Sequence, residues 1–202
     1  MKLILIRHGE SEADLLKVHE GRADFSLTDR GKGQARLLSK WLAAKEDFDF
    51  LLSSPLKRAK ETAQFISKET GKPIILAEEL MEWDNGLLAG LPREEAAKKY
   101  PLPKGGRKPH HTNWGTESMI NFRARAETFL SELKEEYPKD AQLCIISHGG
   151  MINMLYRSLL NLSMQTEQSI RCGDTSIHKF ILKEDKCDIE YINRLEHLSE
   201  LL

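Results

Sequence analysis

The sequence contains little cysteine, no excess of either charge and no long apolar run. Its three cysteines, Cys144, Cys172 and Cys187, lack the paired spacing of metal ligands, and no secretory signal is visible, so we expect a reducing, cytoplasmic location. The net charge of −1 argues against a basic face that binds nucleic acid. No apolar stretch approaches the roughly 20 residues of a membrane span, so no membrane partner is expected.

Length and composition predict one globular domain. The chain has 202 residues, of which 40% are hydrophobic and 30% are charged, an ordinary balance for a folded protein. It contains no low-complexity segment and no linker long enough to divide it. We therefore expect a single domain over residues 1–202, with a loop and helix excursion at about 80–116 that covers the functional site.

Two short apolar segments of the chain end in the same dipeptide. Residues 3–6 read Leu-Ile-Leu-Ile and run into Arg7-His8-Gly9, and residues 143–147 read Leu-Cys-Ile-Ile-Ser and run into His148-Gly149. Such runs are typical of strands buried on both faces. Ligands of open parallel sheets bind at the carboxyl ends of the strands. If the two strands lie side by side, both histidines reach the same edge of the sheet.

Segments of helical and strand character alternate along the rest of the chain. Residues 12–27 lack periodicity and are expected to form a loop. Thr28 is predicted to cap the next helix, and Ser54 is predicted to cap a later one that starts at Pro55. Apolar spacing predicts helices over 29–44, 55–70, 92–100, 117–137 and 151–160, and strands over 48–52, 74–76, 176–182 and 188–192. We therefore predict an α/β fold with a mostly parallel central sheet and helices on both faces.

A second arginine stands at an unusual place. Arg58 lies in the first turn of a predicted helix, where a cation opposes the helix dipole unless an anion is nearby. If it shares an edge with Arg7, His8 and His148, two cations and two imidazoles surround a space that suits a phosphate dianion. A neutral histidine can then act as the nucleophile in phosphoryl transfer. Gly9 is expected to let backbone amides approach the anion closely.

Such chemistry also needs a carboxyl group that protonates the departing alcohol. Glu82 follows the third predicted strand in a loop that contains glycine, so it is the candidate. The alternative is that Glu82 is an ordinary solvated acidic side chain, which the residues alone do not exclude.

These motifs resemble the histidine phosphatase superfamily, which includes cofactor-dependent phosphoglycerate mutases and broad-specificity phosphatases. The resemblance runs in order from residue 1 to about residue 182. It is carried by Arg7-His8-Gly9-Glu10-Ser11, by Gly21 and Leu27-Thr28, by Gly31 and Gln34-Ala35, by Ser53-Ser54-Pro55-Leu56 with Arg58-Ala59 and Thr62-Ala63, by Glu82 with Gly86, and by Ser147-His148-Gly149. It implies a phosphoglycerate mutase-like fold.

The resemblance also implies roles for individual residues. His8 is expected to carry a transient phosphohistidine, and Glu82 to act as general acid and then as base. Arg7, Arg58 and His148 are expected to bind the phosphate and stabilise its transfer. The residues expected to contact the substrate are Arg7, Gly9, Ser11, Asp14, Gly21, Arg58, His148 and Gly149. No metal and no other cofactor is expected, and phosphate or sulfate is expected to fit the pocket.

One position departs from the family pattern. Asp14 stands where family members commonly have asparagine, a residue that helps to hold phosphate. A carboxylate there repels the substrate unless it points away or pairs with a cation such as Arg7. Glu117-Ser118 resembles the family's Gly-Glu-Ser segment and is interpreted as the start of a helix.

The favoured function is a phosphatase that acts on small phosphorylated metabolites. Family mutases carry an arginine-rich segment before the long helix, whereas residues 101–114 are short and hold Lys104, Arg107 and Lys108 without paired arginines. Trp83, Leu87, Leu88 and Trp114 are candidates for an apolar wall beside the pocket. The alternatives are a mutase, a non-catalytic phospho-ligand binder, and a metal site in which His110 and His111 join His148 or His178. The substrate and the oligomeric state do not follow from the sequence.

Overall fold

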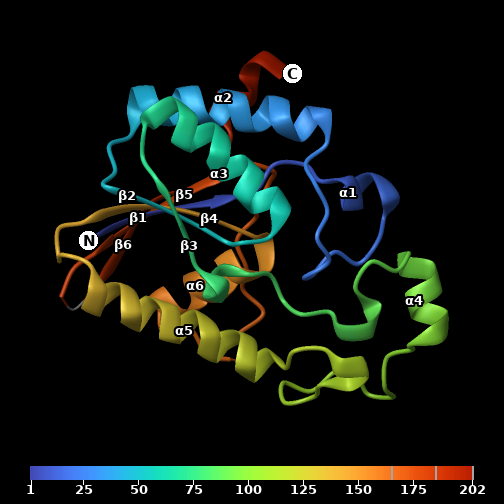
Figure 1. Cartoon of the computed structure of the whole chain (residues 1–202). Coiled ribbons are helices and arrows are strands. Elements are labelled where there is room, and N and C mark those ends of the chain that lie inside the picture. Colours follow the sequence, from blue (N-terminus) through green and yellow to red (C-terminus); the bar gives the residue numbers. More distant parts are fainter. Residues whose placement is uncertain (165, 185, 202) are drawn as a thin grey trace.

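The computed structural model describes residues 1–164, 166–184 and 186–201. It contains a six-stranded sheet in the order β3-β2-β4-β1-β5-β6, with helices packed against it (Figure 1). The strands are β1 (Lys2–Arg7), β2 (Phe50–Ser53), β3 (Ile74–Leu76), β4 (Gln142–Ser147), β5 (Ile177–Leu182) and β6 (Cys187–Arg194). The α-helices are α1 (Glu12–Leu16), α2 (Asp29–Lys45), α3 (Lys57–Thr70), α4 (Arg93–Lys99), α5 (Met119–Glu136) and α6 (Gly149–Leu159), and 3₁₀ turns cover Glu78–Leu80, Gly86–Leu88, Asn113–Gly115 and Glu196–Leu201.

The strand β1 lies in the interior of the sheet between β4 and β5. It pairs with β4 in parallel, and its last residue, Arg7, lies opposite Ser147. The predicted pairing of the two strands that precede the histidines is therefore confirmed. The strands β3, β2, β4 and β1 run parallel, while β5 is antiparallel to both β1 and β6. The sheet is mixed and mostly parallel, as predicted.

Alternate residues of β1 face the two layers of helices. Leu3 and Leu5 pack in one apolar cluster with residues of α5 and α6, while Ile4 and Ile6 pack in a second cluster with residues of α2 and α3. All four side chains are fully buried. A strand covered on both faces must be apolar at every position, which is why its sequence shows no alternation. Figure 1 shows α2 and α3 on one side of the sheet and α5 on the other.

Two helix starts show where local signals were sufficient and where they were not. Thr28 caps α2, because its side chain accepts a hydrogen bond from the backbone N–H of Gly31 at 2.9 Å. The predicted cap at Ser54 is wrong: α3 begins at Lys57, and Leu56 occupies the N-cap position. The Ser54 hydroxyl accepts the backbone N–H of Leu56 at 3.3 Å and also lies 2.8 Å from Nε2 of His148, a contact between distant parts of the chain.

The predicted loop over residues 12–27 contains a short helix, α1. Its N-terminus is closed by a reciprocal capping arrangement between Ser11 and Asp14, in which the Asp14 carboxylate accepts the Ser11 backbone N–H at 2.9 Å. The helix ends at Leu16, and Lys17 adopts a left-handed conformation with φ 53°. One helical turn is too short to produce an apolar period, so the pattern did not reveal it. Figure 1 shows α1 and α4 beyond one end of the sheet.

Among the described helices, none combines the length and the apolarity that crossing a bilayer requires.

Candidate active site

His8 follows the last residue of β1, and its ring is held in one tautomer. Its Nδ1 lies 2.7 Å from the carbonyl oxygen of Gly9. Because a carbonyl only accepts hydrogen bonds, Nδ1 carries the proton and Nε2 has the free electron pair. Burial, together with the charges of Arg58 and Arg7, lowers the pKa of His8 well below 6.5, although the Gly9 carbonyl opposes this. The imidazole is therefore neutral at neutral pH, and Nε2 carries the lone pair of the ring.

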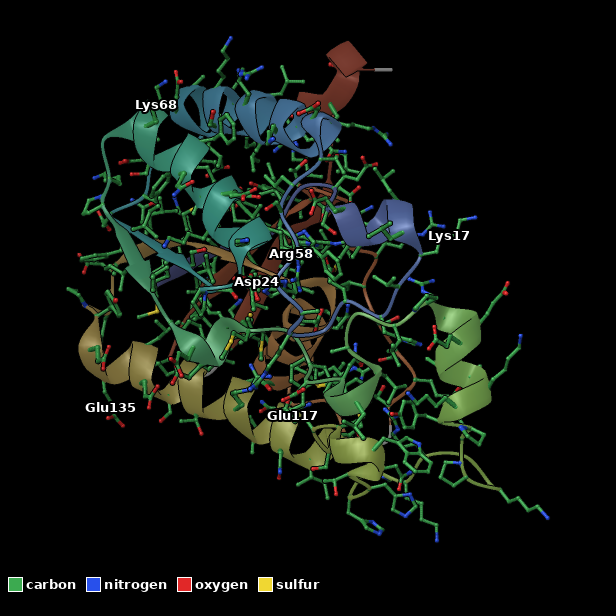
Figure 2. All side chains as sticks on the ribbon, turned by 45° about the vertical axis from the view of Figure 1, so that its right-hand side comes forward. Lys17, Asp24, Arg58, Lys68, Glu117 and Glu135 are labelled. Atoms are coloured by element: carbon green, nitrogen blue, oxygen red, sulfur yellow. The ribbon has the colours of Figure 1, made fainter. Side chains whose placement is uncertain are left out.

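Arg58 is the largest fully buried side chain of the protein's described part. Its guanidinium donates to the carbonyl oxygens of Gly21 at 2.8 Å and Ala23 at 3.1 Å, and its Nε donates to His8 Nε2 at 3.1 Å. Figure 2 shows Arg58 in the interior of the molecule, whereas Lys68 extends outward at the other end of the same helix. These partners explain how a cation is tolerated in the first turn of α3, and they aim one N–H at the histidine.

His148 is the N-cap residue of α6, and its ring centroid lies 5.0 Å from that of His8. Its Nε2 lies 2.8 Å from the Ser54 hydroxyl oxygen, and its buried Nδ1 has no hydrogen-bond partner among the described residues. Burial first, and then the charges of Arg58, His8 and Arg7, lower the pKa of His148 well below 6.5. An unpartnered buried ring nitrogen is costly, and a bound anion that accepts its proton would remove that cost.

Arg7 forms the exposed side of the cluster. Its Nη1 donates to the carbonyl oxygen of Cys172 at 2.7 Å, and its Nη2 lies 3.2 Å from the Asp174 carboxylate and 4.0 Å from that of Asp14. The side chain is 22% exposed, and it lines a pocket of ≈ 460 Å³. The structure therefore brings Arg7, His8, Arg58 and His148 together at the carboxyl edge of the parallel strands.

Glu82 lines the same pocket as Arg7. One carboxylate oxygen accepts the backbone N–H of Gly150 at 2.9 Å, and the other accepts that of Trp83 at 2.8 Å. A Cβ atom on Gly150 would lie 2.2 Å from the carboxylate, so only glycine permits this approach. Glu82 is thus fixed at the pocket wall and is not a freely solvated side chain.

Two residues that support the Glu82 loop were not identified from the sequence as a functional pair. Arg125 on α5 donates to the carbonyl oxygens of Glu79 and Met81, both at 2.6 Å, and its Nε and Nη2 lie 3.1 and 2.9 Å from the two Glu117 carboxylate oxygens. Glu117 was interpreted as the start of a helix, but it precedes α5 and its carboxylate binds this arginine. The available signal was the spacing of Arg125, a charged residue three positions after Phe122, which places it beside the buried face of the helix.

The structure corrects the expectation for Gly9. Its N–H donates to the Thr62 hydroxyl at 3.2 Å, so this amide is not free to bind an anion. The residue must be glycine for a different reason: a Cβ atom would lie 2.7 Å from the carbonyl oxygen of Gly31. Close packing of the loop against α2 therefore requires the glycine.

The other predicted substrate contacts have structural partners. Ser11 Oγ donates to Glu20 at 2.5 Å and is 3.2 Å from Asp14. Asp14, whose orientation was left open, caps α1, approaches Arg7 and lines the pocket. Gly21 has φ +51° and presents its carbonyl to Arg58. A Cβ atom on Gly149 would lie 3.9 Å from Arg7 Cδ, so this backbone borders the cluster.

Of the four residues proposed as an apolar wall, Trp83 lines the pocket, Leu88 is buried, and Leu87 and Trp114 are 60% and 39% exposed. The described residues contain no group of three or more histidine, cysteine, aspartate or glutamate side chains placed to hold a metal ion. His110 and His111 pack against each other with ring centroids 4.7 Å apart.

Fold and site together define a class of protein. A neutral histidine with a fixed tautomer lies among two guanidinium groups and a second imidazole, an arrangement that binds an oxyanion beside a nucleophilic nitrogen. The model of the histidine phosphatase superfamily (branch 1) matches residues 3–195. The chain belongs to this superfamily, as its motifs indicated.

Relatives of known sequence and structure agree with this assignment. Phosphoserine phosphatase 1 of Hydrogenobacter thermophilus is 32% identical over 203 residues, which cover 99% of this chain and 95% of the relative. Phosphoserine phosphatase of Entamoeba histolytica, in complex with 3-phosphoglyceric acid, superposes with a TM-score of 0.80 at 30% identity over 98% of both chains. The alpha-ribazole phosphatase of Shigella flexneri gives 0.84 at 25% identity over 96% of both. Proteins named as phosphoglycerate mutases are also similar to the chain.

Proposed function

We propose that the chain is a phosphatase that hydrolyses small phosphomonoesters through a phosphohistidine on His8. The observation that carries this proposal is the state of the His8 ring. Nδ1 is tied to the Gly9 carbonyl, and Nε2 faces the Nε–H of Arg58 with His148 beside it. Nucleophilic nitrogen and anion-binding groups thus meet at one point, which phosphoryl transfer requires.

In the first step, His8 Nε2 attacks phosphorus and the ester P–O bond breaks. Arg58 and Arg7 stabilise the charge on the non-bridging oxygens. The Ser54 hydroxyl donates a hydrogen bond to His148 Nε2, so the one N–H of that neutral ring is on the unpartnered Nδ1. Nδ1 then donates a hydrogen bond to a phosphoryl oxygen. The departing alcohol oxygen takes a proton from Glu82.

In the second step, the Glu82 carboxylate accepts a proton from water. The water oxygen attacks phosphorus, the P–N bond breaks, and inorganic phosphate leaves with His8 restored to its neutral form. Two backbone amides hold Glu82 at the pocket wall, and Arg125 fixes the loop that carries it. The same carboxyl group can therefore serve as acid and then as base.

The small number of cationic side chains at the pocket favours hydrolysis over mutase activity. A mutase must hold a second phosphate while the phosphoenzyme waits. Lys104 and Lys108 are exposed, and the Arg107 guanidinium lies over the Trp83 ring, 4.9 Å from its centroid. The cationic side chains that line the pocket in the described structure are Arg7 and Arg93.

The proposal is tested with an aryl phosphate and a matched pair of variants. We expect His8→Ala to abolish phosphate release and acid-labile labelling of the protein by ³²P. Glu82→Gln is expected to retain phosphate binding and to lower kcat by about 10²–10⁴, the usual contribution of a general acid. A His8→Ala protein with wild-type turnover would refute the proposal. Comparing phosphoserine, alpha-ribazole phosphate and 3-phosphoglycerate, with phosphate release measured against isomerisation, distinguishes phosphatase from mutase.

A further inference from the structure

Glu20 is a carboxylate that the catalytic scheme does not use, and it lies inside the basic cluster. Its Oε1 is 3.2 Å from Arg58 Nε, and its Oε2 is 3.8 Å from His8 Nε2. Its side chain is 19% exposed and lines the pocket, whereas the side chains of His8 and Arg58 beneath it are 2% and 0% exposed. Glu20 therefore separates the nucleophilic nitrogen from the pocket through which a substrate enters.

The two atoms that Glu20 approaches are the two that a phosphoryl group needs. Phosphorus must come within about 3–3.5 Å of the attacking nitrogen for reaction. The Arg58 Nε–H donates to His8 Nε2 in this structure, and the Glu20 carboxylate lies 3.2 Å from the same Nε. A phosphoryl dianion bound beside His8 would lie against this carboxylate, and the two negative charges would repel each other strongly.

We propose that Glu20 is a determinant of substrate affinity: its ionised carboxylate occupies the phosphoryl position beside His8 and Arg58, and substrate binding displaces it. This inference rests on the proposed function, since it concerns the same phosphoryl pocket. It assigns to Glu20 the role of an internal competitor for anions, which protonation would weaken.

The surroundings of Glu20 support such a role. It faces Arg7 of β1, His8 directly after that strand, Asp14 of α1 and Arg58 of α3. Burial raises the pKa of Glu20, although Arg58 and a hydrogen bond from Ser11 oppose this. Glu82 lines the opposite part of the same pocket. The charge of Glu20 is therefore balanced by Arg58 and is sensitive to a second anion.

Sulfate is the suitable probe, because it carries two negative charges throughout the pH range of the experiment and needs no turnover. We expect Glu20→Gln to bind sulfate about tenfold more tightly than the wild type at pH 8, since one charged contact that competes with the anion is removed. The difference should shrink as the pH falls, because burial raises the pKa of Glu20 and its protonation makes the wild type resemble the variant. Both proteins keep the same histidines, so their ratio isolates Glu20.

Glu12→Gln is the matched control. Glu12 is exposed on α1, and its substitution removes the same charge eight residues before Glu20. It should bind sulfate as the wild type does. The inference is overturned if Glu20→Gln binds sulfate no better than the wild type at pH 8, if the ratio does not change with pH, or if Glu12→Gln has the same effect.

Two further measurements keep the inference testable if Glu20→Gln does not fold. Glu20→Ala removes the same charge and should also tighten sulfate binding at pH 8. By linkage, calorimetry in two buffers at a pH where the sulfate affinity of the wild type depends on Glu20 should show more proton uptake on sulfate binding to the wild type than to Glu20→Ala, and equal uptake in the two proteins contradicts the inference. Because sulfate binding involves no chemistry, these results stand apart from the His8→Ala test of the proposed function.

Discussion

Acidification is expected to destabilise the protein through two buried histidines outside the candidate site. His178 on β5 donates from Nε2 to Ser176, while its Nδ1 accepts the backbone N–H of Asn193 at 3.2 Å. This arrangement requires a neutral ring, because a proton on Nδ1 would face a donor. Burial lowers the pKa of His178 from 6.5 to about 4, and it does the same for His197.

The sign and size of the effect follow from proton linkage. Between pH 6.5 and 4 the unfolded chain binds a proton at each of these positions and the folded chain does not, so the free energy of unfolding decreases as the pH falls. At about 1.36 kcal/mol per pKa unit, one such histidine costs about 2 kcal/mol at pH 5 relative to pH 8. His8 and His148, whose pKa values are also lowered, act in the same direction. Glu20, whose pKa is raised, acts in the opposite one.

A variant isolates one histidine from the other titrating groups. We expect His178→Asn to lose about 2 kcal/mol less than the wild type between pH 8 and pH 5, whatever its stability at pH 8. The exposed His110 serves as a control, and His110→Asn should lose as much as the wild type. Urea denaturation at each pH, extrapolated to zero denaturant, gives the free energies. Equal losses in His178→Asn and the wild type would refute the reasoning.

Three further predictions concern backbone space, the brace of the Glu82 loop and the family departure. Gly31→Ala should destabilise the protein by about 2 kcal/mol or more, because the new Cβ would lie 2.0 Å from a backbone carbonyl oxygen. In the same helix, the new Cβ of Gly33→Ala meets nothing within 4 Å, so this variant should be more stable by about 0.5–1 kcal/mol. Thermal melts of the two variants compare these effects. Arg125→Lys keeps the charge but loses the planar fork, so kcat on an aryl phosphate should fall about tenfold or more. Asp14→Asn should lower KM for phosphomonoesters in steady-state assays, because a carboxylate 4.0 Å from Arg7 is removed while the cap of α1 is retained.

Each of these predictions has a clear contrary result. Equal effects of Gly31→Ala and Gly33→Ala would show that the loop yields to the new methyl group. Wild-type kcat in Arg125→Lys would mean that the charge alone holds the loop. An unchanged KM in Asp14→Asn would place that side chain outside the reach of the substrate.

Much of the fold could be predicted from the sequence because its signals are local. The runs before His8 and His148 are apolar at every position, and Thr28 precedes a regular apolar stripe, so the strands and the helix followed from neighbouring residues. The helix α1 was missed because five residues contain no apolar period. The predicted start of α3 is two residues early: the Ser54 hydroxyl accepts the Leu56 N–H, but the helix begins only at Lys57, and the same hydroxyl contacts His148, 94 positions away.

The residues of the candidate site likewise divide into those with a local signal in the sequence and those without one. Arg58 stood out because a cation at a helix N-terminus is locally unfavourable, and Glu82 because it follows a strand. Glu20 gave no such signal: it lies in a loop with no pattern, and only its contacts with His8 and Arg58 reveal it. The spacing of Arg125 places its charge beside the buried face of a helix, but its carbonyl partners belong to another segment of the chain.

The strand order also governs when the protein can fold. Among the six strands of the sheet, β1 is synthesised before the others, and it pairs with β4 and β5, so Leu3 finds its partners Leu143 and Phe180 only after those residues are synthesised. Contacts so distant in sequence slow folding, and an unpaired apolar strand is prone to aggregate meanwhile. A nascent chain that ends before β5 therefore leaves residues 3–6 without one of the two strands that flank them in the folded sheet.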